Sequence, residues 1–294
     1  MGIEKMKAEV KASKIEINEL PRYSPWPSRL FGLSDWNIKH RNNVIVSHEY
    51  GEKWGRLLSK YRERKFTNIN EALHYLFDTH FSDNILFHIH ENIYHTTNTP
   101  AFWDFFYNQI IQAIAKYLTP NDTLVEIGCG WGRNLFTLYQ RKLFKNAIGG
   151  EFTQEGITLG NLIAKDFNVP VQLFHFDYYN PKQEFLEKIN GTVVFSHNSI
   201  EQITQMPQKT ILSLIENRPK IVFHFEPIYE YRNKDTLLHY MWKRYTQVNE
   251  YNINLLTLLK DFEKKGQIRI DLEVPHVLGL NAFNPGSFIV WQPI

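Results

Sequence analysis

The sequence predicts an α/β protein with a seven-stranded, doubly wound, mostly parallel sheet. Strand-like and helical segments alternate after Thr119, a pattern typical of parallel strands joined by right-handed crossovers. The last two strand-like segments are joined by PHVLGLNAFNPG. Since this connection is too short for a crossover helix, it predicts a C-terminal antiparallel hairpin. The preceding segment lacks the alternation and predicts an N-terminal, mainly helical extension.

This extension, residues 1–118, is expected to form a helical and irregular cap. Residues 1–20 are charged and expected to be loosely ordered. Residues 21–36 contain three prolines and two tryptophans, which predicts an irregular segment docked on the core. Residues 100–118 are the clearest helix, because Thr99 can cap it and Pro100 suits the first helical position.

Seven strands are predicted within the second domain, residues 119–294. Helical patterns separate the first five strands, and the last two form the hairpin. The expected strands are residues 124–128, 146–152, 171–177, 192–197, 221–227, 267–274 and 287–292.

The segment LVEIGCGWGRN, residues 124–134, predicts a ligand site at the end of the first strand. Gly128, Gly130 and Gly132 stand where the strand turns into a helix, so positive φ angles and close approach of a ligand to bare backbone are expected. Glu126 precedes them and could accept hydrogen bonds from a cationic ligand group.

Two further acids end the second and third predicted strands. Glu151 ends the second strand, where an acid commonly binds ribose hydroxyls. Asp177 ends the third strand and could accept a hydrogen bond from an adenine amine, with Tyr178 covering the ring face. The alternative is a glycine-rich turn with incidental surface acids.

The E-x-G-x-G-x-G pattern resembles the first motif of the class I S-adenosylmethionine-dependent methyltransferases, and the resemblance covers roughly residues 119–294. Dinucleotide enzymes use the related G-x-G-x-x-G, but have no routine use for the acid before the glycines or for the third acid. The resemblance implies S-adenosylmethionine as the cofactor. The expected cofactor-binding residues are Glu126, Gly128, Cys129, Gly130, Gly132, Asn134, Glu151, Phe152, Asp177 and Tyr178. The Cys129 side chain is expected to pack rather than to act as a nucleophile.

Two pairs of polar residues follow predicted strands four and five. His197 and Glu201 would lie about one helical turn apart, and His224 and Glu226 would share one strand face. We expect all four to converge beside the methyl donor, since ligands bind beyond the carboxyl ends of such strands.

Three interpretations of this cluster remain open at the level of sequence. A histidine oriented by a glutamate could be the general base. Alternatively, His197, Glu201 and His224 could hold a divalent metal ion. The third interpretation gives these groups only structural roles.

Five histidines crowd the extension and invite a second metal interpretation. They are His74, His80, His88, His90 and His95. No cysteine joins them and no HExxH pattern appears, so histidines satisfied at the surface are the favoured account.

Composition bounds the function. Hydrophobic residues make up 43% of the 294 residues, yet no window approaches a membrane span, and the N-terminus lacks a signal-peptide apolar region. The net charge of +2, with basic and acidic residues interspersed, gives no electrostatic indication of nucleic-acid binding, and the single cysteine fits a reducing cytoplasm.

We expect a cytoplasmic enzyme that methylates an oxygen or nitrogen of a small molecule. The alternatives are a methyltransferase for protein or RNA, and a catalytically silent cofactor-binding module. The oligomeric state is not indicated.

Overall fold

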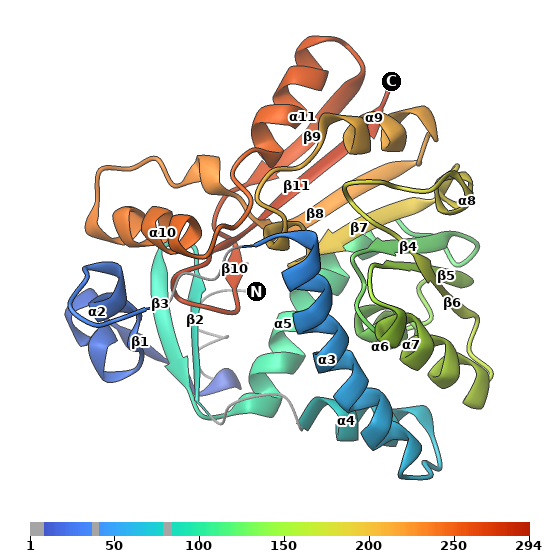
Figure 1. Cartoon of the computed structure of the whole chain (residues 1–294), viewed down its shortest axis with the longest axis horizontal. Helices are drawn as coiled ribbons and strands as arrows, with labels where there is room; N and C mark the ends of the chain where they lie inside the picture. The colour runs from blue at the N-terminus through green and yellow to red at the C-terminus, as the bar shows by residue number, and fades with distance from the viewer. Residues whose placement is uncertain (1–8, 37–40, 79–83) are drawn as a thin grey trace.

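The computed structural model describes residues 9–36, 41–78 and 84–294. Its main body is a seven-stranded sheet of order β6-β5-β4-β7-β8-β11-β9, whose strands follow one another from β9 at the top to β6 at the right of Figure 1. The strands are β4 (Thr123–Ile127), β5 (Asn146–Glu151), β6 (Val171–His175), β7 (Val193–His197), β8 (Ile221–Pro227), β9 (Ile268–Val274) and β11 (Gly286–Pro293). Strands β4 to β8 pair in parallel, whereas β11 is antiparallel to both β8 and β9. The predicted fold class is confirmed for this part of the chain.

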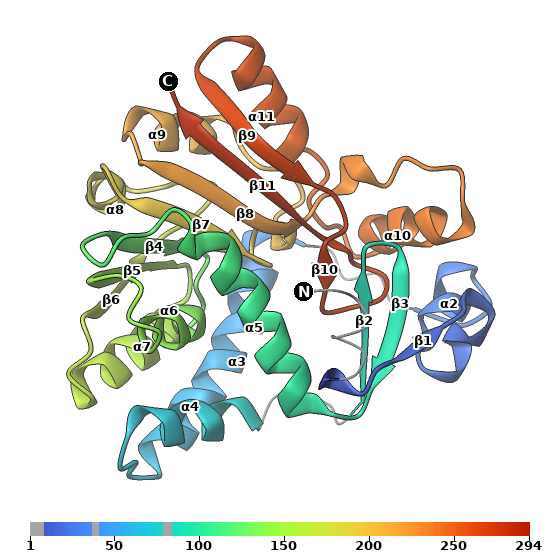
Figure 2. The ribbon, with the colours of Figure 1, turned by 180° about the vertical axis from the view of Figure 1, so that it is seen from behind.

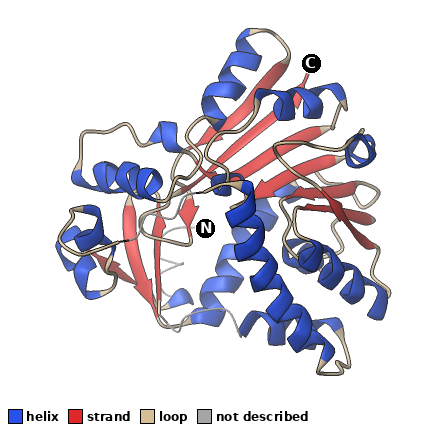
Figure 3. Ribbon diagram, viewed as in Figure 1, coloured by secondary structure: helices blue, strands red, loops and turns tan. Residues whose placement is uncertain are grey.

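Helices cover both faces of this sheet, as Figure 3 shows. Side chains alternate along β4, so that Leu124 packs into one hydrophobic cluster and Val125 and Ile127 pack into the other. The first cluster contains α5 (Thr99–Ala115), α6 (Arg133–Tyr139) and α7 (Gln154–Asp166). The second contains α8 (Gln183–Leu186), η2 (Glu187–Ile189), α9 (Gln208–Glu216) and α11 (Leu255–Lys264).

The extension is mainly helical, as predicted, but it also contains a small sheet. It contains β1 (Ser13–Ile15), β2 (Ile85–Ile89) and β3 (Asn92–Thr96), which form an antiparallel sheet of order β1-β3-β2-β10. The fourth strand, β10 (Leu278–Gly279), comes from the connection between β9 and β11. The C-terminal pair is therefore antiparallel as predicted, but its connecting loop leaves the main sheet to pair with β2.

The main helices of the extension are η1 (Ile17–Arg22), α2 (Trp26–Leu30), α3 (Asn43–Arg62), α4 (Ile69–Asp78) and α5, which is the helix predicted at residues 100–118. The expectation of loose order for residues 1–20 is wrong for residues 13–20, which form β1 and most of η1; residues 1–8 lie outside the described residues. Short strands such as β1 have weak sequence signals, because their pairing partners lie far away in the sequence.

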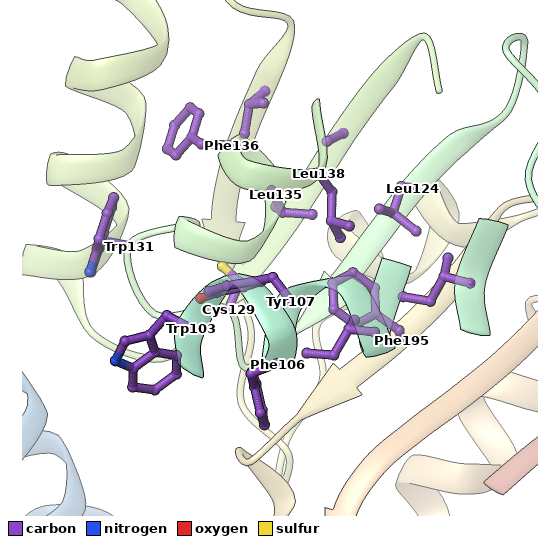
Figure 4. Packing of buried hydrophobic residues seen from close by; sticks show 14 of the residues in the cluster. Trp103, Phe106, Tyr107, Leu124, Cys129, Trp131, Leu135, Phe136, Leu138 and Phe195 are labelled. Atoms are coloured by element: carbon purple, nitrogen blue, oxygen red, sulfur yellow. The ribbon is translucent and has the colours of Figure 1, made fainter. Parts of the chain in front are cut away.

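The extension and the sheet share one hydrophobic core. Leu57 of α3 and Phe87 of β2 belong to the same buried cluster as Leu124 of β4. Helix α3 lies in front in Figure 1, and α5 lies in front in Figure 2, where the molecule is seen from behind. In Figure 4, Trp103 and Tyr107 of α5 lie beside the glycine loop. No helix in the described ranges is long and apolar enough to cross a bilayer.

Candidate active site

A cavity of about 410 Å³ opens at the carboxyl ends of the central strands. The glycine loop and the ends of β5 and β7 line one side. Helix α3, helix α10 (Leu237–Val248) and the loop after β10 line the other. The strand order reverses between β4 and β7, which is where doubly wound sheets bind ligands.

The glycine loop has the backbone conformation that the sequence predicts. Gly128, Gly130 and Gly132 have φ angles of 73°, 57° and 83°, in the left-handed region that side chains disfavour. A Cβ at position 130 would lie 3.0 Å from the ring of Trp54 on α3. Gly128 and Gly130 line the cavity, whereas Gly132 caps α6 and borders Leu173.

Glu126 is 1% exposed and lines the cavity below this loop. Its Oε1 accepts a hydrogen bond from the Asn134 side chain at 2.5 Å, and the hydroxyl of Tyr107 donates to the Oδ1 of Asn134 at 3.1 Å. Its Oε2 is buried without a hydrogen-bond partner among the described residues. Burial raises the pKa of Glu126 well above its usual value. A buried carboxylate oxygen of this kind suits a cationic donor.

Glu151 is fixed as a bridge between the glycine loop and the start of α7. It accepts hydrogen bonds from the backbone N–H of Gly130 at 3.0 Å and of Thr153 at 3.0 Å, and from the Thr153 hydroxyl at 2.6 Å. Four acceptor directions are available to a carboxylate, so this preorganised group can still accept from a ligand. Glu151 lines the cavity, and its ribose-binding role stays a prediction.

Asp177 and Tyr178 have different environments. Asp177 lines the cavity and accepts a hydrogen bond from the backbone N–H of Tyr179 at 2.8 Å. The Tyr178 hydroxyl donates to the Ile127 carbonyl at 3.0 Å and lies 2.7 Å from the Ser199 hydroxyl. Tyr178 therefore borders the cavity mainly as a support for the loop. Its role of covering an adenine ring stays a prediction, and Phe152, which also lines the cavity, is a second candidate for that role.

Cys129 also lines the cavity, and its thiol is 3.5 Å from the carbonyl of Gly130. Burial raises the thiol pKa well above its usual value, and Glu126 and Glu151 add to the shift. A thiol in this state is a poor nucleophile, which agrees with the expected packing role.

The predicted convergence of His197 and His224 is wrong. In the parallel pairing of β7 with β8, His197 lies beside Phe225 and His224 lies beside Ser196. Neighbouring residues of a strand point to opposite faces, so the two imidazoles lie on opposite sides of the sheet. His224 is fully buried, within 2.9 Å of the Ser196 hydroxyl through Nδ1 and accepting from the Trp291 indole through Nε2 at 2.9 Å. Both of its ring nitrogens are thus engaged by protein groups.

Glu226 does not join the cavity lining drawn from the described residues. Its two oxygens each accept a hydrogen bond from the Ser199 backbone N–H at 3.1 Å.

Because His224 lies on the other side of the sheet from His197 and does not line the cavity, His197, Glu201 and His224 do not form the metal site that the sequence offered as an alternative.

His197 and Glu201 both line the cavity, but their pKa values are shifted in opposite directions. Burial and the nearby charge of Arg133 lower the pKa of His197 to about 3. Burial raises the pKa of Glu201 to about 7. Glu201 accepts hydrogen bonds from Gln202 at 2.8 Å and from the side-chain amide of Asn284. Of the two, Glu201 has the pKa that suits proton transfer near neutral pH.

Several cavity residues were missed by the sequence analysis, because they come from outside the motif strands. Tyr50, Lys53 and Trp54 reach the cavity from α3, and Tyr251 follows α10. Arg133 directly follows the last glycine of the motif, and its guanidinium lies 3.7 Å from the ring centre of Phe77. Of these residues, only Arg133 could have been identified from the sequence, because it stands next to the glycine motif.

The extension histidines do not share a site in the part of the chain that the structure describes. His88 is fully buried in β2, and His90 occupies the following turn with a φ of 53°. The His95 ring lies 3.2 Å from the Asn84 side chain, and His74 is exposed. His80 lies outside the described residues.

Comparison of the sequence with protein-family models and with curated proteins finds no match. Solved structures do match. Magnesium protoporphyrin IX methyltransferase from Synechocystis, with bound SAH, is 10% identical, covering 86% of this chain and 100% of that chain with a TM-score of 0.50. Geranyl diphosphate C-methyltransferase from Streptomyces coelicolor is 14% identical, covering 64% of this chain and 82% of that chain with a TM-score of 0.42. From the sheet order and the first of these likenesses, the chain has the fold of the class I, Rossmann-like S-adenosylmethionine-dependent methyltransferases.

Proposed function

We propose that this protein binds S-adenosylmethionine in the cavity and transfers its methyl group to an oxygen or nitrogen of a small molecule. The observation that carries the proposal is the buried Oε2 of Glu126, which has no hydrogen-bond partner within the described residues. It lies in the same cavity as Glu151 and Asp177. Three acids along one ligand-sized cavity match the amine, ribose and adenine groups of this cofactor.

The amino-acid end of the cofactor would lie between Glu126 and Arg133. Both line the cavity, and each is close enough to shift the pKa of the other. Aromatic rings surround the guanidinium, whose central carbon lies 4.9 Å from the ring centres of Trp103 and Tyr107. A buried acid and a buried guanidinium at one end of a cavity form a complementary pair for an ammonium and a carboxylate.

Glu151 and Asp177 would hold the adenosine part. The two backbone N–H bonds and one hydroxyl bond to Glu151 fix its carboxylate at the end of β5 before any ligand arrives. Asp177 is held by the Tyr179 N–H and faces the cavity two residues after β6. Preorganised groups lose little conformational entropy on binding.

When bound, S-adenosylmethionine supplies an activated methyl group, so the protein must mainly align the acceptor and remove a proton. Glu201 is the favoured proton acceptor. Its side chain is partly buried and lines the cavity, and desolvation raises its pKa to about 7. His197 is the second candidate, but its lowered pKa makes it a weaker base.

Polar and aromatic side chains line the acceptor side of the cavity. Tyr50, Tyr245, Tyr251, Asn281 and Asn284 contribute to its lining. A cavity volume of about 410 Å³ is within the range of small-molecule sites. The net charge of +2 supplies no strong attraction to RNA. These features favour a small polar acceptor over a macromolecular one, and the ionisable Glu201 favours turnover over a silent binding module.

The experiment is a two-arm transfer assay with S-adenosylmethionine carrying a labelled methyl group. One arm contains a small-molecule extract of cells that produce the protein, and the other contains their RNA and protein. We expect S-adenosylhomocysteine release and label transfer in the small-molecule arm, with little transfer by Glu201→Gln. Transfer only to RNA or protein would overturn the acceptor class, and no transfer in either arm would favour the silent module.

A further inference from the structure

Three segments far apart in the sequence bring two imidazoles and a carboxylate together outside the cavity. Glu91 lies in the turn between β2 and β3, His239 lies at the start of α10, and His276 lies in the turn after β9. One donor atom from each residue lies within 4.8 Å of the other two. In the described ranges, no other group of three or more such residues meets this condition.

Both imidazoles are buried with a nitrogen that lacks a hydrogen-bond partner. His239 and His276 are 1% and 4% exposed, and Nε2 of each is unsatisfied as judged from the described residues. Glu91 Oε1 lies 3.6 Å from His239 Nε2. Buried polar atoms without partners are uncommon in folded proteins and call for a reason, such as an ion.

The orientation of the two rings is fixed by neighbouring groups. Their centroids are 5.2 Å apart at an interplanar angle of 78°, and the Trp242 ring lies 4.8 Å from His239 and 4.7 Å from His276. His276 has a φ of 52°, and its backbone N–H donates a hydrogen bond to the Ser287 hydroxyl at 3.1 Å. The imidazoles are thus held close together rather than free to turn into solvent.

We propose that Glu91, His239 and His276 bind a divalent transition-metal ion, of which Zn²⁺ is the best fit. Two imidazole nitrogens and one carboxylate oxygen are donors that Zn²⁺ and its neighbours prefer, whereas Mg²⁺ and Ca²⁺ prefer oxygen donors only. Ligand distances of about 2.0–2.2 Å place tetrahedral donors about 3.5 Å apart. The three side chains must therefore close inward when the ion binds.

Two contacts compete with the ion and must change. The Lys234 ammonium pairs with Oε1 of Glu91, and the backbone N–H of Lys234 lies 3.3 Å from His239 Nδ1. Coordination of the ion through Nε2 of His239 requires a proton on its Nδ1. The contact between the Lys234 backbone N–H and Nδ1 must therefore open. The Lys234 side chain is 56% exposed and can turn into solvent. Arg232 also lies near His276 and reduces the affinity for a cation.

The expected role of the ion is structural. The three residues join the extension hairpin, α10 and the loop after β9. These last two elements lead to Tyr245 and Asn281, which line the acceptor side of the cavity. None of the three metal-binding residues is among the described residues that line this cavity. The ion would therefore act on the cavity indirectly, by holding the elements of its acceptor side in place. This inference does not depend on methyl transfer.

The test uses the full chain, stripped of metal with EDTA and desalted. Zn²⁺ is titrated against a chromophoric chelator, Co²⁺ binding is followed by its visible absorption, and the melting temperature is recorded with and without Zn²⁺. The variants are Glu91→Gln, which changes a half-exposed turn residue, and His276→Ala. The matched control is His48→Ala, which removes one member of an exposed histidine–glutamate pair on α3.

We expect one Zn²⁺ per chain, an intense tetrahedral-type Co²⁺ spectrum and a raised melting temperature. Partners of metal ligands are worth about 10- to 100-fold in affinity, so loss of a direct ligand in Glu91→Gln or His276→Ala should weaken binding by at least that factor. The His48→Ala control should bind as the wild type does, and Lys234→Met should bind more tightly. No stoichiometric binding by the wild type, or equal affinity in the wild type and Glu91→Gln, would overturn the proposal.

Discussion

The side-chain amide of Asn134 holds Oε1 of Glu126 at 2.5 Å, whereas Oε2 of the same cavity-lining carboxylate has no hydrogen-bond partner among the described residues. Burial raises the pKa of Glu126 well above its usual value, since removal from water disfavours the charged form. A cationic ligand group would reverse this preference. Ligand binding and the protonation of Glu126 are therefore linked.

Binding of S-adenosylmethionine should release a proton that Glu126→Gln cannot release. The measurement is titration calorimetry in phosphate and in Tris, because the difference in binding enthalpy between the buffers counts protons. We expect Glu126→Gln to release fewer protons and to bind at least about tenfold more weakly, since a charged hydrogen bond is worth more than 1.4 kcal/mol. Glu184→Gln, an exposed control, should match the wild type. Equal proton counts in Glu126→Gln and wild type would rule out the linkage.

Substituting Glu201 should slow transfer without weakening cofactor binding. Removal of a general base costs on the order of 10²- to 10⁴-fold in rate, and the cofactor-binding acids are untouched. Burial raises the pKa of Glu201 to about 7. The wild-type rate should therefore rise with pH through about 7 as the carboxyl loses its proton, and this rise should vanish in Glu201→Gln. A Glu201→Gln variant with the wild-type pH–rate profile would transfer the role to another group.

Glu226 should make the stability of the protein depend on pH. Burial and the nearby Glu201 raise its pKa from 4.5 to about 8. Between these two pH values the carboxyl group is ionised in the unfolded chain but protonated in the folded one. The free energy of unfolding therefore falls as pH rises, by about 1.4 kcal/mol for each pH unit. Glu226→Gln removes this effect, and its melting temperature relative to wild type should increase from pH 5 to pH 8. A difference that stays constant over this range would show that Glu226 does not titrate as stated.

The sequence predicts the main sheet well because each strand carries a local signal. All seven predicted strands are present, and β8 begins and ends where expected, at Ile221 and Pro227. The glycines take positive φ angles because a tight strand-to-helix turn demands them. Such features depend on neighbouring residues and are readable from one chain.

The errors concern features that depend on pairing between distant segments. The opposite directions of His197 and His224 follow from the register of β7 with β8, which the strand patterns alone do not specify. The contribution of β10 to the extension sheet depends on contacts with β2. For the same reason, the close approach of the Trp54 ring to Gly130 has no local sequence signal.

Removing residues 1–99 should yield insoluble or inactive protein. The truncation deletes α3, which lines the cavity, and leaves β10 without its partner β2. It also uncovers Trp103 and Phe106 of α5, both buried in the shared core. Large exposed apolar patches promote aggregation. The measurement is size-exclusion chromatography with circular dichroism, and a folded, monomeric, fully active truncation would show that the extension is a separate module.

The most direct test of the central claim is calorimetric titration of S-adenosylmethionine into wild type, Gly130→Ala and Gly191→Ala. Both glycines have positive φ, but a Cβ at position 130 would meet the Trp54 ring at 3.0 Å, whereas one at position 191 has nothing within 4 Å. The pair therefore separates local backbone strain from loss of the ligand site. We predict one cofactor per chain with micromolar affinity in wild type and Gly191→Ala, and binding at least about tenfold weaker, or 1.4 kcal/mol, in Gly130→Ala. No binding by the wild type, or equal binding by wild type and Gly130→Ala, would contradict the assignment of this cavity to S-adenosylmethionine.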